Sequence, residues 1–238
     1  MLADGPPSRS SGKLKSGVIA NGHSRAAILD FILDQLPRWR DRPDRPQRTS
    51  ETPLTSQLCA HLNSAARKTA GVDYLQFRSE EADEMQPSRK IDMVAAPAVD
   101  ALVVEGRTYS DFETILPIEC KRLPTPSGTG RDEREYVITK AGASGGIQRY
   151  KEGKHGSTHE RAALIAYVQS QTFEHWQNMI EGWIRELHMA GSPGWTSADA
   201  LTTERNDVTA GIAVHESVHT RGDLPAIRLR HMWISMQR

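Results

Sequence analysis

The chain of 238 residues is long enough for one large domain, and its 37% apolar residues and 18 glycines suit a single hydrophobic core. Short apolar runs occur along most of the sequence, which excludes a collagen-like, coiled-coil or fully disordered chain. Thirty basic residues balance thirty acidic ones, so no overall charge indicates a nucleic-acid or membrane partner, and any such interaction must come from a local cluster.

The cysteines and the N-terminal sequence favour a soluble protein of the reducing cytoplasm. Cys59 and Cys120 each lie in an apolar run, which predicts buried thiols rather than a disulfide scaffold. Residues 1–22 are rich in Pro, Gly, Ser and Lys, lack the apolar block of a signal peptide, and are predicted to form a flexible tail. No stretch reaches the roughly 18 apolar residues that a membrane span needs. We therefore expect a cytoplasmic protein with a single domain over residues 23–238.

Two helices are predicted in the first seventy residues. The first follows the candidate N-cap Ser24 and ends at Pro37, and its large apolar residues share one face. A charged linker broken by prolines comes next. The second helix begins at the capping residues Thr49 and Ser50, and its leucines recur every four residues, at Leu54, Leu58 and Leu62.

The remaining chain alternates between strand and helix patterns. Three strands are predicted first, followed by a short helix, a strand apolar on both faces, a long amphipathic helix and a strand pair around Gly222. In chain order these elements cover residues 72–79, 89–97, 113–123, about 137–152, 160–169, 172–190 and 208–236. This order predicts an α/β fold with a mixed central sheet flanked by helices.

Three charged residues lie on two of the predicted strands. Glu119 and Lys121 are two positions apart, so on a strand they point to the same face, and Asp92 comes beside them if the two strands pair. A solvated strand face with an incidental ion pair is the simpler interpretation of such a pattern. The flanking residues are apolar, however, and an unpaired buried charge is costly, which favours a ligand-binding cluster. Two facing carboxylates repel each other unless a hard divalent cation such as Mg²⁺ neutralises them.

With these residues, the chain resembles the PD-(D/E)XK nuclease superfamily over about residues 50–170. Asp92 matches the motif aspartate of that family, and Glu119 and Lys121 match its E-x-K half. Glu51, on the preceding helix, matches the acidic residue that many members add to the metal site. Ile91 stands where the name-giving proline of the family would be. The resemblance implies a restriction-endonuclease-like core, with residues 171–238 as a C-terminal extension of a helix and a hairpin.

The same resemblance implies a metal-dependent chemistry. Asp92, Glu119, the backbone carbonyl of Cys120 and Glu51 would hold Mg²⁺, or Mn²⁺ in its place, against the scissile phosphate. Lys121 would orient or deprotonate the attacking water and stabilise the transition state. The thiol of Cys120 is expected to be a packing group and not a nucleophile.

Polar and basic residues follow the sheet in the segment GGIQRYKEGKHG. Relatives place a glutamine and an aromatic residue on this helix, so Gln148 is assigned to the edge of the site, whereas Tyr150 lies two positions further instead of four. Four basic residues are predicted to contact the phosphates of a nucleic acid, in a manner independent of sequence and sensitive to salt. They are Arg149, Lys151 and Lys154 in this segment and Arg122 on the third predicted strand. A solvated helix face is the alternative interpretation of the residues in the segment.

A second motif offers a competing chemistry, because His215, Glu216 and His219 fit the H-E-x-x-H pattern of zinc proteases. That pattern requires a helix, whereas the surrounding valines predict a strand, on which the two histidines would lie about 13 Å apart. No third ligand follows at the expected position. The pair His155 and His159 is a weaker candidate, since Gly156 lies between them and the segment resembles a loop.

The resemblance therefore implies a Mg²⁺-dependent DNA nuclease, as in bacterial restriction or defence systems, with a partner protein of such a system as a possible associate. The alternatives are a non-catalytic nucleic-acid-binding module with a nuclease-like fold and a zinc-dependent hydrolase. Residues 124–136 form the candidate loop for reading a DNA sequence. Because one site cuts one strand, we expect a homodimer. The candidate interface is the helix over residues 172–190 with the hairpin that closes at Met236, which hold Trp176, Trp183, Trp195 and Trp233. The stripe over residues 173–187 also has the spacing of a core helix.

Overall fold

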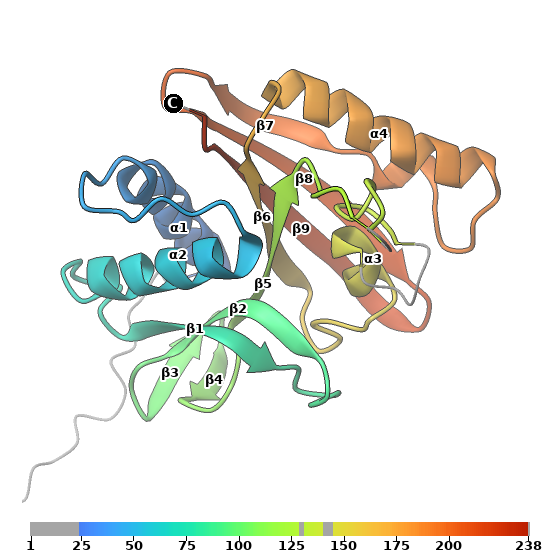
Figure 1. The fold of residues 1–238 in the computed structure, drawn as a ribbon. Coiled ribbons are helices and arrows are strands. Elements are labelled where there is room, and N and C mark those ends of the chain that lie inside the picture. Colours follow the sequence, from blue (N-terminus) through green and yellow to red (C-terminus); the bar gives the residue numbers. More distant parts are fainter. Residues whose placement is uncertain (1–23, 129–130, 140–144, 238) are drawn as a thin grey trace, which may run out of the picture.

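The central sheet contains seven strands in the order β1-β2-β5-β6-β9-β8-β7 (Figure 1). The computed structural model describes residues 24–128, 131–139 and 145–237, so the tail predicted for residues 1–22 lies outside the described residues. The strands of the sheet are β1 (Leu75–Ala82), β2 (Lys90–Pro97), β5 (Leu116–Leu123), β6 (Arg161–Val168), β7 (Thr202–Asp207), β8 (Ile212–Arg221) and β9 (Leu224–Ser235). β5, β6 and β9 run parallel to one another and the other neighbours pair antiparallel. The sheet is therefore mixed, as predicted.

The connection between β2 and β5 contains a separate short hairpin, made of β3 (Ala101–Val104) and β4 (Arg107–Ser110). Its two turn residues, Glu105 and Gly106, have φ angles of 50° and 81°. Two successive positive φ angles are typical of the tight turn that suits the twist of a hairpin. β7 was not predicted, because its sequence TTERND is polar and largely exposed and lacks an alternating pattern.

Four α-helices occur in the described residues: α1 (Arg25–Arg40), α2 (Glu51–Ala66), α3 (Gly146–Lys151) and α4 (Phe173–Met189). The predicted end of the first helix at Pro37 is wrong, since α1 continues for three more residues. A proline in the last turn removes only one hydrogen bond, and the continuation buries Trp39 against Tyr167 with ring centroids 5.8 Å apart. None of the helices described is both long and apolar enough to cross a membrane.

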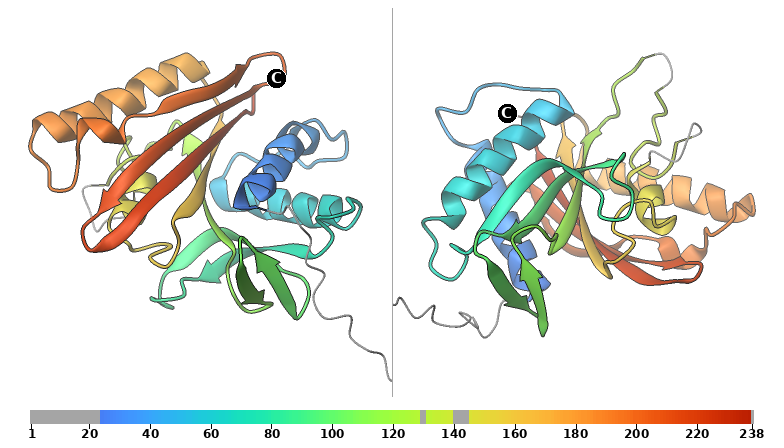
Figure 2. Two further views of the ribbon diagram at one scale, coloured as in Figure 1. Left: turned by 180° about the vertical axis from the view of Figure 1, so that it is seen from behind. Right: turned by 90° about the horizontal axis from the view of Figure 1, so that it is seen from below.

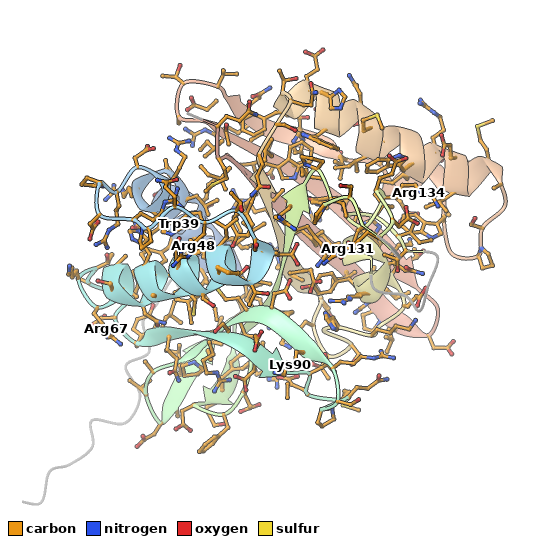
Figure 3. The ribbon with its side chains drawn as sticks, viewed as in Figure 1. Trp39, Arg48, Arg67, Lys90, Arg131 and Arg134 are labelled. Atoms are coloured by element: carbon orange, nitrogen blue, oxygen red, sulfur yellow. The ribbon has the colours of Figure 1, made fainter. Side chains whose placement is uncertain are left out.

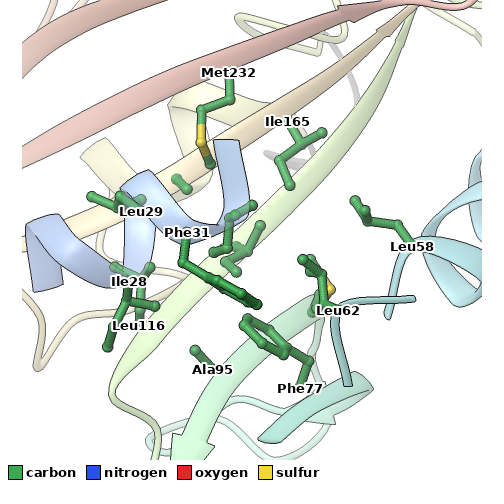
Figure 4. Close-up of a cluster of buried hydrophobic side chains, with 14 of the residues drawn as sticks. Ile28, Leu29, Phe31, Leu58, Leu62, Phe77, Ala95, Leu116, Ile165 and Met232 are labelled. Carbon is green, nitrogen blue, oxygen red and sulfur yellow. The ribbon is translucent and has the colours of Figure 1, made fainter. Parts of the chain in front are cut away.

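Helices cover both faces of the sheet, with α1 and α2 on one side and α3 and α4 on the other (Figures 1 and 2). Each face carries its own apolar core. Along β6 the side chains alternate between the two: Ile165 and Tyr167 face α1 and α2, whereas Leu164 and Ala166 face α3 and α4. Figure 4 shows the first core, where Phe31 of α1 stacks on Phe77 of β1 with centroids 6.2 Å apart. A strand buried on both faces was predicted at this position and is confirmed.

The second core contains the tryptophans that were the candidate dimer interface. Trp176, Trp183, Trp195 and Trp233 are at most 8% exposed and pack inside the protomer. They pack α4 and the segment after it onto the sheet, so the interface assignment to these side chains is corrected. The core interpretation of the stripe over residues 173–187 is the one that the structure supports.

Truncation of Ile165, which is fully buried in the middle of the sheet, is expected to lower the free energy of unfolding substantially. For Ile165→Ala we expect a loss of about 3 kcal/mol, because a large buried side chain leaves a cavity that the sheet cannot close. Urea denaturation followed by circular dichroism measures this loss. Val208→Ala is the control: Val208 is 78% exposed, and its truncation is expected to cost less than about 0.5 kcal/mol. Equal losses for both variants would contradict the two-core description.

Candidate active site

The edge of β5 that faces β2 is open beyond Ile118. β2 pairs with β5 only as far as this residue, whereas β6 pairs along the rest of β5. Carboxylates take the place of the missing strand: Asp92 Oδ2 accepts a hydrogen bond from the Cys120 amide at 2.8 Å, and Glu51 Oε2 accepts one from the Arg122 amide at 3.2 Å. These bonds satisfy backbone groups that would otherwise be unpaired. The Cys120 carbonyl lies on the same edge, because the N–H and C=O of one strand residue point to the same side.

The ammonium group of Lys121 lies among three carboxylates. Its Nζ is 2.8 Å from Glu119 Oε1, 3.4 Å from Glu51 Oε1 and 3.8 Å from Asp92 Oδ2. The acids come from β2, from β5 and from the first turn of α2. The structure thus brings together Glu51, Asp92, Glu119 and Lys121, the four side chains assigned to the centre of the site.

Glu119 is fully buried and is surrounded by positively charged or basic groups. Arg149 of α3 donates to its Oε1 at 2.6 Å, and His155 Nδ1 lies 3.3 Å from its Oε2. The second oxygen, Oε2, makes no hydrogen bond. Burial alone would raise the pKa of Glu119, but Lys121, His155 and Arg149 outweigh it and hold the pKa well below its usual range. Glu119 is therefore a carboxylate near neutral pH.

The pKa values of Asp92 and Lys121 are both raised, but for different reasons. Burial raises the pKa of Asp92 to about 7, and the negative charge of Glu119 adds to this effect while Lys121 opposes it. Burial would lower the pKa of Lys121, yet Glu119, Asp92 and Glu51 together raise it above its usual value. Lys121 therefore keeps its positive charge, whereas the ionised form of Asp92 is disfavoured.

The site opens to solvent on the side of α2. The side chains of Glu51 and Asp92 are 26% and 27% exposed, in contrast to 5% for Lys121. Both acids line a small pocket of about 30 Å³, together with Glu80 and the hydroxyl-bearing residues Thr52, Thr55, Ser56 and Ser79. This volume holds a water molecule or an ion. Glu80, opposite Asp92 on β1, has a φ of 53°, which interrupts the regular pairing of the two strands at this point.

Not all of the predicted peripheral residues reach the centre. Gln148 bonds to the Thr139 amide and to Glu152, and not to the four central side chains. Lys154 pairs with Glu152, and the guanidinium of Arg122 donates to the Thr49 carbonyl. Three further cations labelled in Figure 3 pair with carboxylates outside the centre: Arg131 with Glu135, Arg134 with Asp132 and Lys90 with Glu80.

The predicted phosphate contact of Lys151 does not match its position, and neither does the alternative of a solvated helix face. Lys151 is 7% exposed, pairs with the buried Asp199 and lies 5.0 Å from the ring of Trp195. Its amphipathic pattern on a short helix could not distinguish this buried position from an exposed one.

Sequence reasoning missed one member of the site. His155 was considered only as a zinc ligand, yet it lies beside Glu119 and is 2% exposed. Tyr150 is fully buried next to it, with ring centroids 6.3 Å apart. The turn at Gly156, which has a φ of 59°, brings His155 back toward the sheet, and no spacing rule predicts such a return.

The histidines of the H-E-x-x-H motif lie on a strand, as expected. His215 bonds to Thr203, Glu216 pairs with Arg228 at the surface, and His219 bonds to Asp199. Within residues 24–128, 131–139 and 145–237, no three His, Cys, Asp or Glu side chains are grouped closely enough to hold a metal ion by themselves. Cys59 and Cys120 are buried free thiols, as predicted.

Comparisons of the chain with protein-family models, with curated proteins and with solved structures find no match.

Proposed function

We propose that the protein is a Mg²⁺-dependent nuclease that hydrolyses phosphodiester bonds of DNA. The observation that carries the proposal is the convergence of Glu51, Asp92, Glu119 and Lys121 at an open strand edge. Three carboxylates converge there on one lysine, one arginine and the imidazole of His155. Burial and the like charge of Glu119 raise the pKa of Asp92, and a carboxyl perturbed in this way is typical of a functional site, where a bound cation would relieve the repulsion.

The donor atoms suit a hard divalent cation. Mg²⁺ is bound in proteins through one or two carboxylates with water and phosphate oxygens as the other ligands, so three grouped protein side chains are not required. Asp92, Glu119 and the Cys120 carbonyl would hold the ion, and Glu51 would complete the set directly or through water. Oε2 of buried Glu119, which makes no hydrogen bond and has His155 Nδ1 at 3.3 Å, supports this assignment. A bound Mg²⁺ supplies Lewis-acid activation of the phosphate and lowers the pKa of water.

The basic side chains would act on the substrate by charge. Lys121 keeps its proton beside the carboxylates, which favours a role in orienting the water and stabilising the developing negative charge over a role as a base. Arg149, 23% exposed at its side chain, would neutralise phosphate oxygens next to Glu119. Arg122 and Lys154 remain the proposed contacts to the DNA backbone.

The broader assignments follow from this chemistry. DNA is the proposed substrate, and restriction or defence is the proposed role, in which a partner protein of such a system would be an associate. Cleavage of both strands by a chain with one site requires two copies or two encounters, and a homodimer is the simplest arrangement.

Incubation of the purified chain with supercoiled plasmid is the direct test. We expect cleavage with Mg²⁺ or Mn²⁺ and none with EDTA, and a homodimer is expected to give linear plasmid without prior accumulation of nicked circles. Salt should weaken binding steeply, because the contacts are to phosphates. Binding of DNA without any cleavage would instead identify a non-catalytic module, and cleavage of a peptide with Zn²⁺ would favour the hydrolase alternative.

A further inference from the structure

A chain of buried polar side chains runs beneath α3, on the face of the sheet opposite α1 and α2. Its members, which we call the buried relay, are each at most 7% exposed. They are Lys151, Asp199, His219, Ser217, His231, Tyr136 and Trp233. They come from α3, from the short 3₁₀ turn Ser197–Asp199, from β8 and β9, and from the segment before α3.

The donors and acceptors of the relay follow from its two ends, because the Trp233 indole can only donate and the Asp199 carboxylate can only accept. His219 Nδ1 must donate to Asp199, and with both histidines neutral each bond further in then has one direction, so the Tyr136 hydroxyl accepts from Trp233 Nε1 at 2.9 Å and donates to His231 Nδ1 at 2.8 Å. Burial lowers the pKa of His231 well below its usual value, which keeps the ring neutral. His231 therefore carries its proton on Nε2 and donates it to Ser217 Oγ at 2.8 Å.

The hydrogen bonds at the outer end of the relay run in the same direction, from Ser217 through His219 to Asp199. Ser217 donates to His219 Nε2 at 2.7 Å, and His219 Nδ1 donates to Asp199 Oδ1 at 2.6 Å. Lys151 Nζ pairs with the same carboxylate oxygen. Burial would raise the pKa of Asp199, but the bonds from His219 and Lys151 outweigh it and bring the pKa to about 2. Every group of the relay thus has a partner, and the charge of Lys151 is balanced.

Asp199, His219 and Ser217 have the order of hydrogen bonds of a serine-hydrolase triad, but the serine cannot serve as a nucleophile here. It is 3% exposed, and its oxygen already accepts a hydrogen bond from His231. The relay therefore has a role other than nucleophilic catalysis. The elements joined at its two ends indicate what that role is.

Both ends of the relay hold α3. The helix has only six residues, too few to be stable by itself. At its start, the amides of Gly146, Ile147 and Gln148 donate to the carbonyls of residues 135–137, the segment that Tyr136 fixes to His231. At its end, Lys151 is tied to Asp199. A Cβ atom at Gly146 would lie 2.8 Å from the Tyr136 carbonyl oxygen, so the helix and this segment are in tight contact.

Arg149 lies on α3 between these anchors and donates to Glu119 at 2.6 Å. We propose that the buried relay is a positioning device for the nuclease site, in which Lys151, Asp199 and Tyr136 hold α3 so that Arg149 stays on Glu119. The expected effect of the relay on catalysis rests on the proposed nuclease function. Lys151 thereby acts through Arg149 and not through contact with DNA.

Lys151→Met tests the outer anchor, because it keeps the aliphatic stem on Trp195 and removes the charge. We expect kcat for plasmid cleavage to fall by about 10-fold to 100-fold with KM for DNA nearly unchanged, since a shift of about 1 Å in a positioned group has effects of this size. Hydrogen exchange of the amides in residues 146–152, followed by mass spectrometry, should become at least about tenfold faster. Lys68→Met, on the exposed turn after α2, is the control for the loss of one lysine and should change neither quantity.

Tyr136→Phe tests the inner anchor without disturbing a charge, and it remains informative if Lys151→Met does not fold. We expect the same pattern with a smaller effect, a fall in kcat of about threefold to tenfold with faster exchange in α3. Tyr109→Phe removes another buried hydroxyl, one that bonds to Arg25 far from α3, and should leave both quantities unchanged.

The outcomes separate the two proposals. A raised KM with unchanged kcat in Lys151→Met would show a DNA contact and overturn the positioning role, as would wild-type exchange in α3 for both variants. If the wild type cuts no nucleic acid, the proposed function fails and the catalytic role of the relay falls with it, whereas the exchange data still decide whether the relay anchors α3. Nitrogen chemical shifts should show His219 protonated on Nδ1 and His231 on Nε2, and the reverse tautomers would refute the relay itself.

Discussion

Glu119→Gln is expected to abolish Mg²⁺-dependent cleavage, with a fall in kcat of about 1,000-fold or more. The substitution keeps the shape of the side chain but removes the buried negative charge that faces Lys121 and Arg149. Loss of the cation from the site would forfeit about 4 kcal/mol of transition-state stabilisation, which corresponds to that factor. The measurement is single-turnover plasmid cleavage at saturating enzyme, with Mg²⁺ varied over a wide range.

The same substitution is also expected to destabilise the fold. It leaves two positive groups near each other without their buried partner, and removal of one partner of a buried ion pair costs about 3 kcal/mol. Glu216→Gln is the matched control, because Glu216 is a surface carboxylate paired with Arg228 at 2.7 Å and lies outside the proposed site. It should cost less than about 1 kcal/mol and leave cleavage intact. Full activity in Glu119→Gln, or loss of activity in Glu216→Gln, would contradict the site assignment.

Asp92→Asn is expected to have the opposite effect on stability, while still abolishing cleavage. The pKa of Asp92 in the folded protein, about 7, lies above the ordinary value of 3.8. The folded state therefore binds a proton more tightly than the unfolded state, and the resulting stability is fully present below pH 4 and is lost as the pH rises through 7. Asparagine avoids this loss and still accepts the hydrogen bond from the Cys120 amide.

In EDTA at pH 8, we expect Asp92→Asn to be more stable than the wild type by about 2 kcal/mol. The full pKa difference corresponds to about 4 kcal/mol, and the exposure of the side chain, 27%, reduces the effect. At pH 3.5 the two proteins should have nearly equal stability. Urea denaturation at both pH values measures the difference, with the exposed Asp100→Asn as a control that should change stability by less than about 0.5 kcal/mol.

Addition of Mg²⁺ should reverse the order of stability. The wild type gains stability from the bound ion by mass action, whereas Asp92→Asn gains none. A destabilised Asp92→Asn at pH 8 without metal would show that Asp92 is a structural group and would remove the main argument for a cation site. Stabilisation of both proteins by Mg²⁺ to the same extent would place the ion elsewhere.

Periodicity along the chain was sufficient to predict most of the elements. The four-residue spacing of Leu54, Leu58 and Leu62 predicted α2, and these three side chains are fully buried. The apolar run of β6 predicted a strand covered on both faces. Glu119 and Lys121 had to share a face of β5, because side chains alternate along any strand. These features depend only on local geometry, which is why the sequence predicts them.

The tertiary structure decided how this strand face becomes a site. Whether Asp92 and Glu51 reach the edge of β5 depends on where β2 stops pairing, and no local pattern shows that the pairing ends at Ile118. The return of His155 to Glu119 depends on the turn at Gly156. The burial of Lys151 depends on Asp199, which lies 48 positions further along the chain. These contacts join residues distant in sequence, and their positions follow from how the layers pack, since spacing along a chain determines distances only within one element.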